Sequence, residues 1–306
     1  MEQAVLVHSP KYANWVFDET HPTQGRRFLH GRNRIMKEAQ NRHLNIYEIE
    51  PRLATIDELL MVHDAEYVTD VVVDGISGEW LGSRKDLGEL AQLMAGGTLT
   101  ALNELFNETS LLAVNLAGAK HHAMRDYSSG FCVFADFAIA ANVATNLGER
   151  VAIFDCDAHH GDGTEMLLKS NENVMTFSVH EFGIFPGTGL LSDYKNRAYN
   201  FPLAGKTGNE GLLSATDMFL QASNEFEPSI IFIACGADGL TGDPLSNLEY
   251  TPQGYWGALR SIREEYPTTP ILLGGAGGYL PDSGTPEVWA NATLALMATN
   301  TEVVKP

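Results

Sequence analysis

The stretch VAIFDCDAHHGDG, residues 151–163, places three aspartates and two histidines directly after an apolar run of four residues. Such a run is typical of a strand that is buried on both faces of a parallel sheet. Asp155 and Asp157 are two residues apart, so on a continued strand they would point to the same face. Charged side chains at the end of a buried strand indicate a functional site.

Apolar runs and helical patterns alternate along the whole chain. We expect strands at 4–9, 111–116, 151–157, 174–180, 229–238 and 270–279. We expect helices at 31–42, 55–63, 65–74, 87–106, 134–148, 210–225, 251–266 and 286–299. This order predicts the α/β class, with a mostly parallel β-sheet sandwiched by helices. Because we find no repeat or linker, we expect a single domain over residues 1–306.

Five of the expected strands end in polar or glycine-rich sequence. In open parallel sheets, ligands bind at the carboxyl ends of the strands, where the loops of neighbouring strands converge. We therefore expect these five ends to form one site. They are NLAGAKHH (115–122), FDCDAHHGD (154–162), FSVHEFGIFPGTG (177–189), ACGADG (234–239) and LLGGAGGY (272–279).

The first chemistry that these ends predict is a metal site. Asp157 offers a carboxylate oxygen and His159 an imidazole nitrogen, a pair that suits Zn²⁺ or another divalent transition ion. Asp238 closes a continuous apolar run and is the best third ligand. Two aspartates and one histidine leave a position open for water, as in catalytic zinc sites. The alternative for each aspartate is a capping or ion-pairing role.

The remaining polar groups suit metal-assisted hydrolysis. His121 and His122 form a tandem pair, and Asp155 and Asp162 could each orient one imidazole. A histidine base beside a metal-activated water is the apparatus of that chemistry. Tyr279 follows the glycine-rich GGAGGY and could donate to a carbonyl oxygen as negative charge develops. A phosphate cradle is the alternative for this loop, but it lacks GxGxxG spacing and a P-loop lysine.

Composition limits the partners. The net charge of −19 would repel phosphate backbones, so we expect no direct binding of nucleic acid. The same charge attracts cationic ligands such as lysine-rich peptides or polyamines. There are three cysteines, without the spacing of a disulfide framework. With no signal peptide and no apolar run of about 18 residues, we expect a cytoplasmic protein without a membrane span.

Ordered motifs over most of the chain resemble the zinc-dependent histone deacetylase family of the arginase–deacetylase superfamily, including its bacterial histone deacetylase-like amidohydrolases. The pattern is most similar to the class I and class IV branches. The N-terminal part is similar through EIEPRLATIDELLMVHDAEYV (48–68). The other motifs are GAKHHAMRDYSSGFCVFADFAIAA (118–141), IFDCDAHHGDGTEMLL (153–168), TFSVHEFGIFPGTG (176–189), GADGLTGDPL (236–245) and LLGGAGGY (272–279).

The resemblance implies a role for each matching residue. Zinc, or Fe²⁺ in the same ligand set, would be held by Asp157, His159 and Asp238. His122 would act as general base and then general acid, with His121 as its electrostatic partner. Tyr279 would polarise the amide carbonyl. The orienting carboxylates would be Asp155 for His121 and Asp162 for His122.

The resemblance also implies a monovalent cation, K⁺, and a tunnel for the acyl-lysine substrate. Phe131 and Phe185 would make a narrow apolar slot, for which core packing is the alternative. Leu245 lies near the position where polyamine-specific relatives carry an acidic gate, which disfavours acetylpolyamines. The cation would be held by Asp155, Asp157, His159, Ser178 and the backbone of Val179, and the tunnel lined by Gly130, Phe131, Phe185 and Leu245.

Two departures from the family pattern concern substrate recognition. Lys120 precedes the histidine pair, where the family usually has an aromatic or small neutral residue; we expect this cation at the rim of the site, where it could alter the rim or bind an acidic group of the substrate. Between Val71 and Leu87 we find no match for the rim aspartate that holds the substrate backbone in eukaryotic members.

The sequence supports one principal function and leaves alternatives open. The principal function is a metal-dependent amidohydrolase acting on an N-acyl-lysine or another N-acylated amine, with a small acylated metabolite or polyamine as the alternative substrate. A ureohydrolase of the arginase type would need a D-A-H-x-D pattern, but position 161 is Gly and Asp162 comes one residue late. A binding module on an inactive fold is disfavoured because every expected ligand and Tyr279 are present. The sequence does not indicate the oligomeric state.

Overall fold

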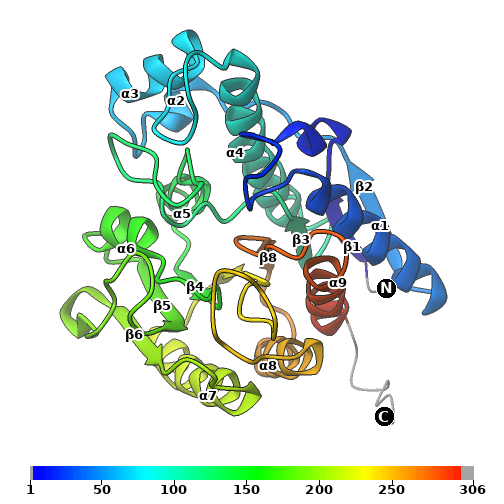
Figure 1. The fold of residues 1–306 in the computed structure, drawn as a ribbon. Coiled ribbons are helices and arrows are strands. Elements are labelled where there is room, and N and C mark those ends of the chain that lie inside the picture. Colours follow the sequence, from blue (N-terminus) through cyan, green and yellow to red (C-terminus); the bar gives the residue numbers. More distant parts are fainter. Residues whose placement is uncertain (1–2, 298–306) are drawn as a thin grey trace.

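The computed structural model describes residues 3–297. They form one eight-stranded sheet in the order β2-β1-β3-β8-β7-β4-β5-β6, and every neighbouring pair is parallel (Figure 1). The predicted parallel α/β fold is confirmed, whereas the single domain over the whole chain stays a prediction. The strands are β1 (Gln3–Val7), β2 (Asn45–Ile49), β3 (Leu112–Asn115), β4 (Val151–Asp155), β5 (Val174–Glu181), β6 (Ala198–Leu203), β7 (Ile230–Ala234) and β8 (Ile271–Gly274).

Helices cover the sheet in two layers (Figure 1). One layer packs side by side in the order α1 (Arg26–Asn41), α9 (Gly284–Met297), α8 (Pro252–Glu265) and α7 (Asn209–Phe226). The other contains α4 (Lys85–Phe106), α5 (Asp136–Asn146) and α6 (Asp162–Leu168). Shorter elements are α2 (Ile56–Leu59), α3 (Ala65–Thr69), a π-helical turn (Asp70–Asp74) and 3₁₀ turns at Pro10–Asn14 and Tyr194–Asn196.

The buried core explains why the central strands were predictable. Every residue of β3, β4, β7 and β8 is buried, so their apolar runs are continuous. Local signals also set helix boundaries. Thr55 and Glu58 form a reciprocal capping box at the start of α2, and Thr251 caps α8 with Pro252 in the first turn.

Several boundaries differ from the expectation. The strands β2 and β6 and the helix α6 were not predicted. The predicted helix 65–74 changes to a π-helical turn after Thr69. The strand expected to reach Asp157 ends at Asp155. Asp157 therefore lies in a loop, and strand alternation does not determine which way its side chain points. The predicted helix 286–299 begins at Gly284, and its last two positions lie outside the described residues.

Candidate metal and catalytic site

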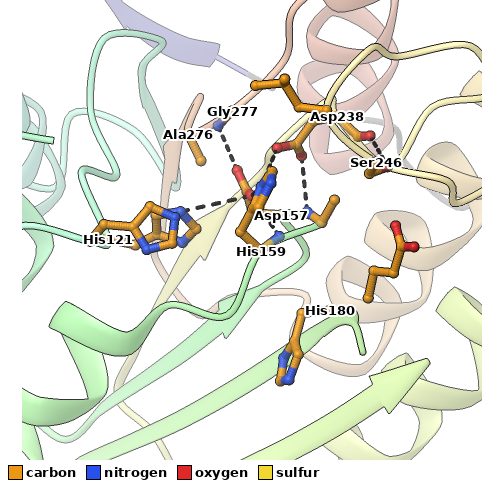
Figure 2. Close-up of polar contacts among 12 residues, drawn as sticks. His121, Asp157, His159, His180, Asp238, Ser246, Ala276 and Gly277 are labelled. Carbon is orange, nitrogen blue, oxygen red and sulfur yellow. Dashed lines mark hydrogen bonds and ion pairs between the residues drawn. The ribbon is translucent and has the colours of Figure 1, made fainter. Parts of the chain in front are cut away.

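Asp157, His159 and Asp238 meet in the loops that follow β4 and β7, and Figure 2 shows their side chains gathered at one point. Their potential ligand atoms, one per residue, all lie within 4.8 Å of one another. Nδ1 of His159 is 3.0 Å from Oδ1 of Asp157 and 2.9 Å from Oδ2 of Asp238. The structure therefore brings the three predicted ligands together.

The electrostatics of this buried group favour a bound cation. Burial and repulsion from Asp157 raise the pKa of Asp238 to about 6. Burial alone would lower the pKa of His159, but the two carboxylates raise it to about 11. Two buried carboxylates at this separation repel each other unless a positive charge lies between them. Two oxygens and one imidazole nitrogen fit a divalent transition ion.

Glycines allow the backbone to approach the carboxylates. The N–H of Gly277 donates to Oδ2 of Asp157 at 2.6 Å. A Cβ on Gly277 would lie 2.3 Å from Oδ2 of Asp238, and one on Gly236 would lie 2.2 Å from Oδ2 of Asp157. No side chain fits at either position, so the close backbone approach requires glycine at both.

The tandem histidines lie beside the metal group, and each is oriented by its predicted carboxylate. Nδ1–H of His121 donates to Asp155 at 2.7 Å, and Nδ1–H of His122 donates to Asp162 at 2.7 Å. Asp155 ends β4, and Asp162 begins α6. Nε2 of His121 lies 3.8 Å from Oδ1 of Asp157, so the pair adjoins the ligand set.

The two imidazoles have opposite charge preferences. Burial lowers the pKa of His121, but Asp155 and Asp157 outweigh it and raise that pKa to about 9. Burial and the charge of His121 lower the pKa of His122 to about 4. At neutral pH His121 is protonated and His122 is neutral, so Nε2 of His122 can accept a proton.

Tyr279 follows the glycine loop and borders the same centre. Its N–H donates to Asp243 at 2.8 Å. Its ring meets the ring of Phe131 edge-on, with centroids 5.9 Å apart, and the Arg27 guanidinium lies 5.7 Å from its centroid. Burial and the nearby charge of Asp238 raise the pKa of Tyr279 well above its ordinary value. The hydroxyl therefore stays protonated and can donate a hydrogen bond.

Three of the four predicted tunnel residues, Gly130, Phe131 and Phe185, border this centre. The ring of Phe185 lies edge-on to that of His122, with centroids 4.9 Å apart. A Cβ on Gly130 would lie 2.4 Å from the His122 ring and 2.9 Å from the Phe185 ring, so only glycine fits between them. Leu245 is half-buried, and its N–H donates to the carboxylate that also holds Tyr279. The substrate tunnel itself stays a prediction.

The residues predicted to hold a monovalent cation are also adjacent. Asp155 of β4 lies directly opposite Ser178 of β5 in the sheet register, and Val179 follows. Asp155 also accepts the N–H of Asp157 at 3.1 Å. This proximity is compatible with the cation site, which stays a prediction.

Sequence reasoning missed a buried carboxylate that holds the histidine loop. Asp136 accepts the N–H of Ala119 at 2.9 Å and that of Lys120 at 2.7 Å. It therefore fixes the backbone just before the tandem histidines. A signal was present, because Asp136 is the one charge in the apolar segment FADFAIAA.

Two further carboxylates support the tunnel walls. Glu79 accepts the N–H of Phe131 at 3.0 Å, and Asp243 bridges the N–H groups of Leu245 and Tyr279. Glu79 lies in the segment 71–87, where no rim aspartate could be matched. The irregular sequence around Glu79 gave no signal of this contact.

The rim position expected of Lys120 was wrong. Lys120 is not at the rim: only 6% of the residue is exposed. Its ammonium lies 5.9 Å from the ring centroid of Trp15 and 5.5 Å from that of Phe28. The reason is tertiary, because the loop after β3 directs this side chain inward among aromatic rings of the N-terminal segment and α1.

Comparison with known proteins agrees with this geometry. The histone deacetylase domain matches residues 21–296. The chain belongs to the histone deacetylase family. It is 31% identical to the acetoin utilization protein AcuC of Bacillus subtilis, over 97% of this chain and 82% of that protein. It is also 31% identical to histone deacetylase HDAC1 of Drosophila melanogaster, over 87% of this chain and 54% of that protein.

A solved structure shares the fold of this histone deacetylase family member. The crystal structure of the HDA15 HD domain superposes with a TM-score of 0.85 at 24% identity, covering 95% of this chain and 90% of that chain. Membership of the family supports a hydrolase of acyl amides and sets aside the ureohydrolase. Among the described residues, no helix is long and apolar enough to cross a membrane.

Proposed function

We propose that the chain is a zinc-dependent deacylase that hydrolyses the amide of an N-acyl-lysine or another N-acylated amine. The observation that carries this proposal is the buried group of Asp157, His159 and Asp238 beside a neutral, carboxylate-oriented His122. A divalent ion held by the three ligands would act as a Lewis acid and lower the pKa of water. The donor set also accepts Fe²⁺.

His122 performs the proton transfers. Nδ1 of His122 is occupied by Asp162, which leaves Nε2 to take a proton from the attacking water. The same atom then gives the proton to the departing amine. His121 stays protonated against Asp155, and its positive charge lies where negative charge develops on the substrate.

Tyr279 stabilises the oxyanion. Its protonated hydroxyl donates to the carbonyl oxygen as that oxygen becomes negative. Asp243 fixes the backbone of Tyr279, so the hydroxyl needs little reorganisation during the reaction. Collapse of the tetrahedral species breaks the C–N bond and yields a carboxylate and an amine.

The net charge and one wall residue bear on the molecule that carries the acyl group. A net charge of −19 attracts lysine side chains and small amines. Leu245 offers no carboxylate to a polyamine, which favours acyl-lysine over acetylpolyamine. Asp155, Asp157, His159, Ser178 and Val179 are proposed to hold K⁺. The three cysteines are free, which suits the reducing cytoplasm as the compartment.

The test is hydrolysis by the purified zinc-loaded protein of a panel of acylated amines. The panel contains acetyl-lysine and long-acyl-lysine peptides, free acetyl-lysine, acetylputrescine and acetylspermidine, with arginine as a control. We expect turnover of an acyl amide, and a loss of about 100-fold or more in kcat in both Tyr279→Phe and His122→Ala.

Tyr127→Phe is the matched control, because this tyrosine is 53% exposed and should leave kcat unchanged. Release of urea from arginine, or full activity of both site variants, would contradict the proposal.

A further inference from the structure

The loop 75–84 lies against one wall of the predicted tunnel. Its Glu79 accepts the N–H of Phe131 at 3.0 Å, and the hydroxyls of Ser77 and Ser128 are hydrogen-bonded at 2.7 Å. Both contacts join the loop to the turn that carries Phe131. The loop therefore forms the surface next to the tunnel on the side of Phe131.

The loop 182–191 carries the second aromatic wall residue, Phe185. A Cβ on Gly130, the neighbour of Phe131, would lie 2.9 Å from the Phe185 ring. The two loops therefore adjoin the same narrow gap, one through each aromatic wall. A molecule that brings an acyl-lysine into this gap has to rest on one loop or on both.

Both loops present large apolar side chains to solvent. Leu81 is 96% exposed and Leu191 is 85% exposed. The others, each about half exposed, are Ile76, Phe182, Phe185 and Leu190. A single exposed apolar residue is ordinary on a protein surface. Six of them in two adjoining loops indicate an interaction surface.

These loops carry almost no charge, although the chain has a net charge of −19. Residues 182–192 contain no charged side chain, and residues 75–83 contain only Glu79. That carboxylate already accepts the N–H of Phe131. A charged partner would find little to pair with on these loops, whereas an apolar partner would remove their side chains from water.

The exposed side chains stand on backbone that is held in place. In the first loop, the buried Trp80 donates its indole N–H to the carbonyl oxygen of Gly75 at 2.9 Å, and the next residue, Leu81, is exposed. In the second, the hydroxyl of Thr188 lies 2.8 Å from Nδ1 of His160. Side chains on such loops need little ordering on binding, which lowers the entropic cost of an interaction.

We propose that the two loops form a docking surface for a polypeptide substrate whose acyl-lysine is flanked by bulky apolar residues. This inference rests on the proposed deacylase function and narrows its substrate class. A free acylated amine inside the tunnel would leave the apolar side chains of both loops in water. A second copy of the chain on these loops would cover the gap through which the substrate enters.

The test compares two acetyl-lysine peptides of equal length and charge on the zinc-loaded protein. One has leucine on both sides of the acetyl-lysine, and the other has serine. We expect kcat/KM to be about tenfold or more higher for the leucine peptide. This ratio should fall toward one when Leu81→Ser and Leu191→Ser are combined. Leu147→Ser, at a leucine that is 66% exposed and lies before the amino end of β4, is the matched control and should keep the ratio.

A binding measurement separates this inference from the proposed function. Calorimetry measures the affinity of both peptides for the Tyr279→Phe protein, with and without the two loop substitutions. Tighter binding of the leucine peptide that is lost with the loop substitutions supports the docking surface even where no peptide is hydrolysed.

Three results would overturn the docking surface and leave the deacylase intact. The first is hydrolysis of both peptides with equal kcat/KM, unchanged by the loop substitutions. The second is turnover of free acetyl-lysine without binding of either peptide. The third is a dimer in sedimentation velocity that the loop substitutions dissociate, because a second copy would then cover the loops.

Discussion

His121 and His122 are adjacent in sequence, yet their surroundings make His121 positively charged and His122 neutral. Both rings are buried and both donate to an aspartate. His121 also faces Asp157 at 3.8 Å, whereas His122 faces the charged ring of His121, with ring centroids 3.9 Å apart. The first neighbour favours a proton and the second opposes one. A pair with one charged and one neutral member can stabilise an anion and accept a proton at the same pH.

Lys120 should reduce the stability of the folded protein, since a buried charge without a partner is unfavourable. Burial and Arg27 lower the pKa of Lys120 from 10.5 to about 8. Below pH 8 both the folded and the unfolded chain hold this proton, and the folded state bears the full cost of about 3 kcal/mol. Between pH 8 and 10.5 the folded state releases it first, so wild-type stability rises with pH.

We therefore predict that Lys120→Met raises the free energy of unfolding at pH 7, and that its advantage over wild type shrinks toward pH 10.5. Urea unfolding of both zinc-loaded proteins at pH 7 and pH 10 measures this difference. Lys11→Met removes a lysine whose side chain is 63% exposed and should show no such advantage. Equal midpoints for wild type and Lys120→Met at pH 7 would argue against a buried charge.

At the scale of elements, the loop after β8 can lie close against the metal ligands because Gly277 has no side chain. A methyl group at Gly277 would overlap carboxylate oxygens of both Asp157 and Asp238. We predict that Gly277→Ala lowers zinc affinity about tenfold or more, because displaced ligands bind metal poorly. Competition with a chromophoric chelator measures the affinity.

The matched control is Gly257→Ala in α8. A Cβ there would meet only a Leu213 methyl, at an ordinary 3.4 Å. This variant should keep wild-type zinc affinity. Unchanged affinity in Gly277→Ala would show that the loop yields without moving the ligands.

The sequence predicted the buried elements and missed the edges of the sheet. The strands β3, β4, β7 and β8 are buried throughout and read as continuous apolar runs. The edge strands β2 and β6 are partly exposed, and β6 contains Pro202, so neither has a clean pattern. The helix α6 has seven residues, too few to show helical periodicity.

For the site, sequence patterns predicted residue types at strand ends but not the direction of each side chain. The ligand set and both histidine–aspartate pairs could be predicted, because parallel strand ends converge. Burial of Lys120 could not, since it depends on Trp15 and Phe28 from the distant N-terminal part of the chain. Arg27, a second buried cation near the site, lies on α1, and the sequence of α1 contains none of the predicted site motifs.

At the scale of the whole molecule, the sheet brings residues from distant parts of the chain to one buried point. The central order β3-β8-β7-β4-β5 places the five loops that carry the site residues next to one another (Figure 1). The packing that buries the site also brings the like charges of Asp157 and Asp238 together. The two carboxylates of the metal group are buried with one imidazole between them. A bound cation should therefore stabilise the fold as well as support the chemistry.

We predict that removal of zinc by a chelator lowers the melting temperature and that added zinc restores it. Zinc at 100 times its dissociation constant contributes about 2.7 kcal/mol to the folded state, a shift on the order of 5 °C for a chain of this size. Differential scanning calorimetry of the metal-loaded and chelated protein measures the shift. His159→Ala, which removes one ligand, should melt at a temperature that depends much less on zinc. If the chelated and zinc-loaded wild type melt together, the buried aspartates are neutralised by protons, and the group of Asp157, His159 and Asp238 is not a metal site.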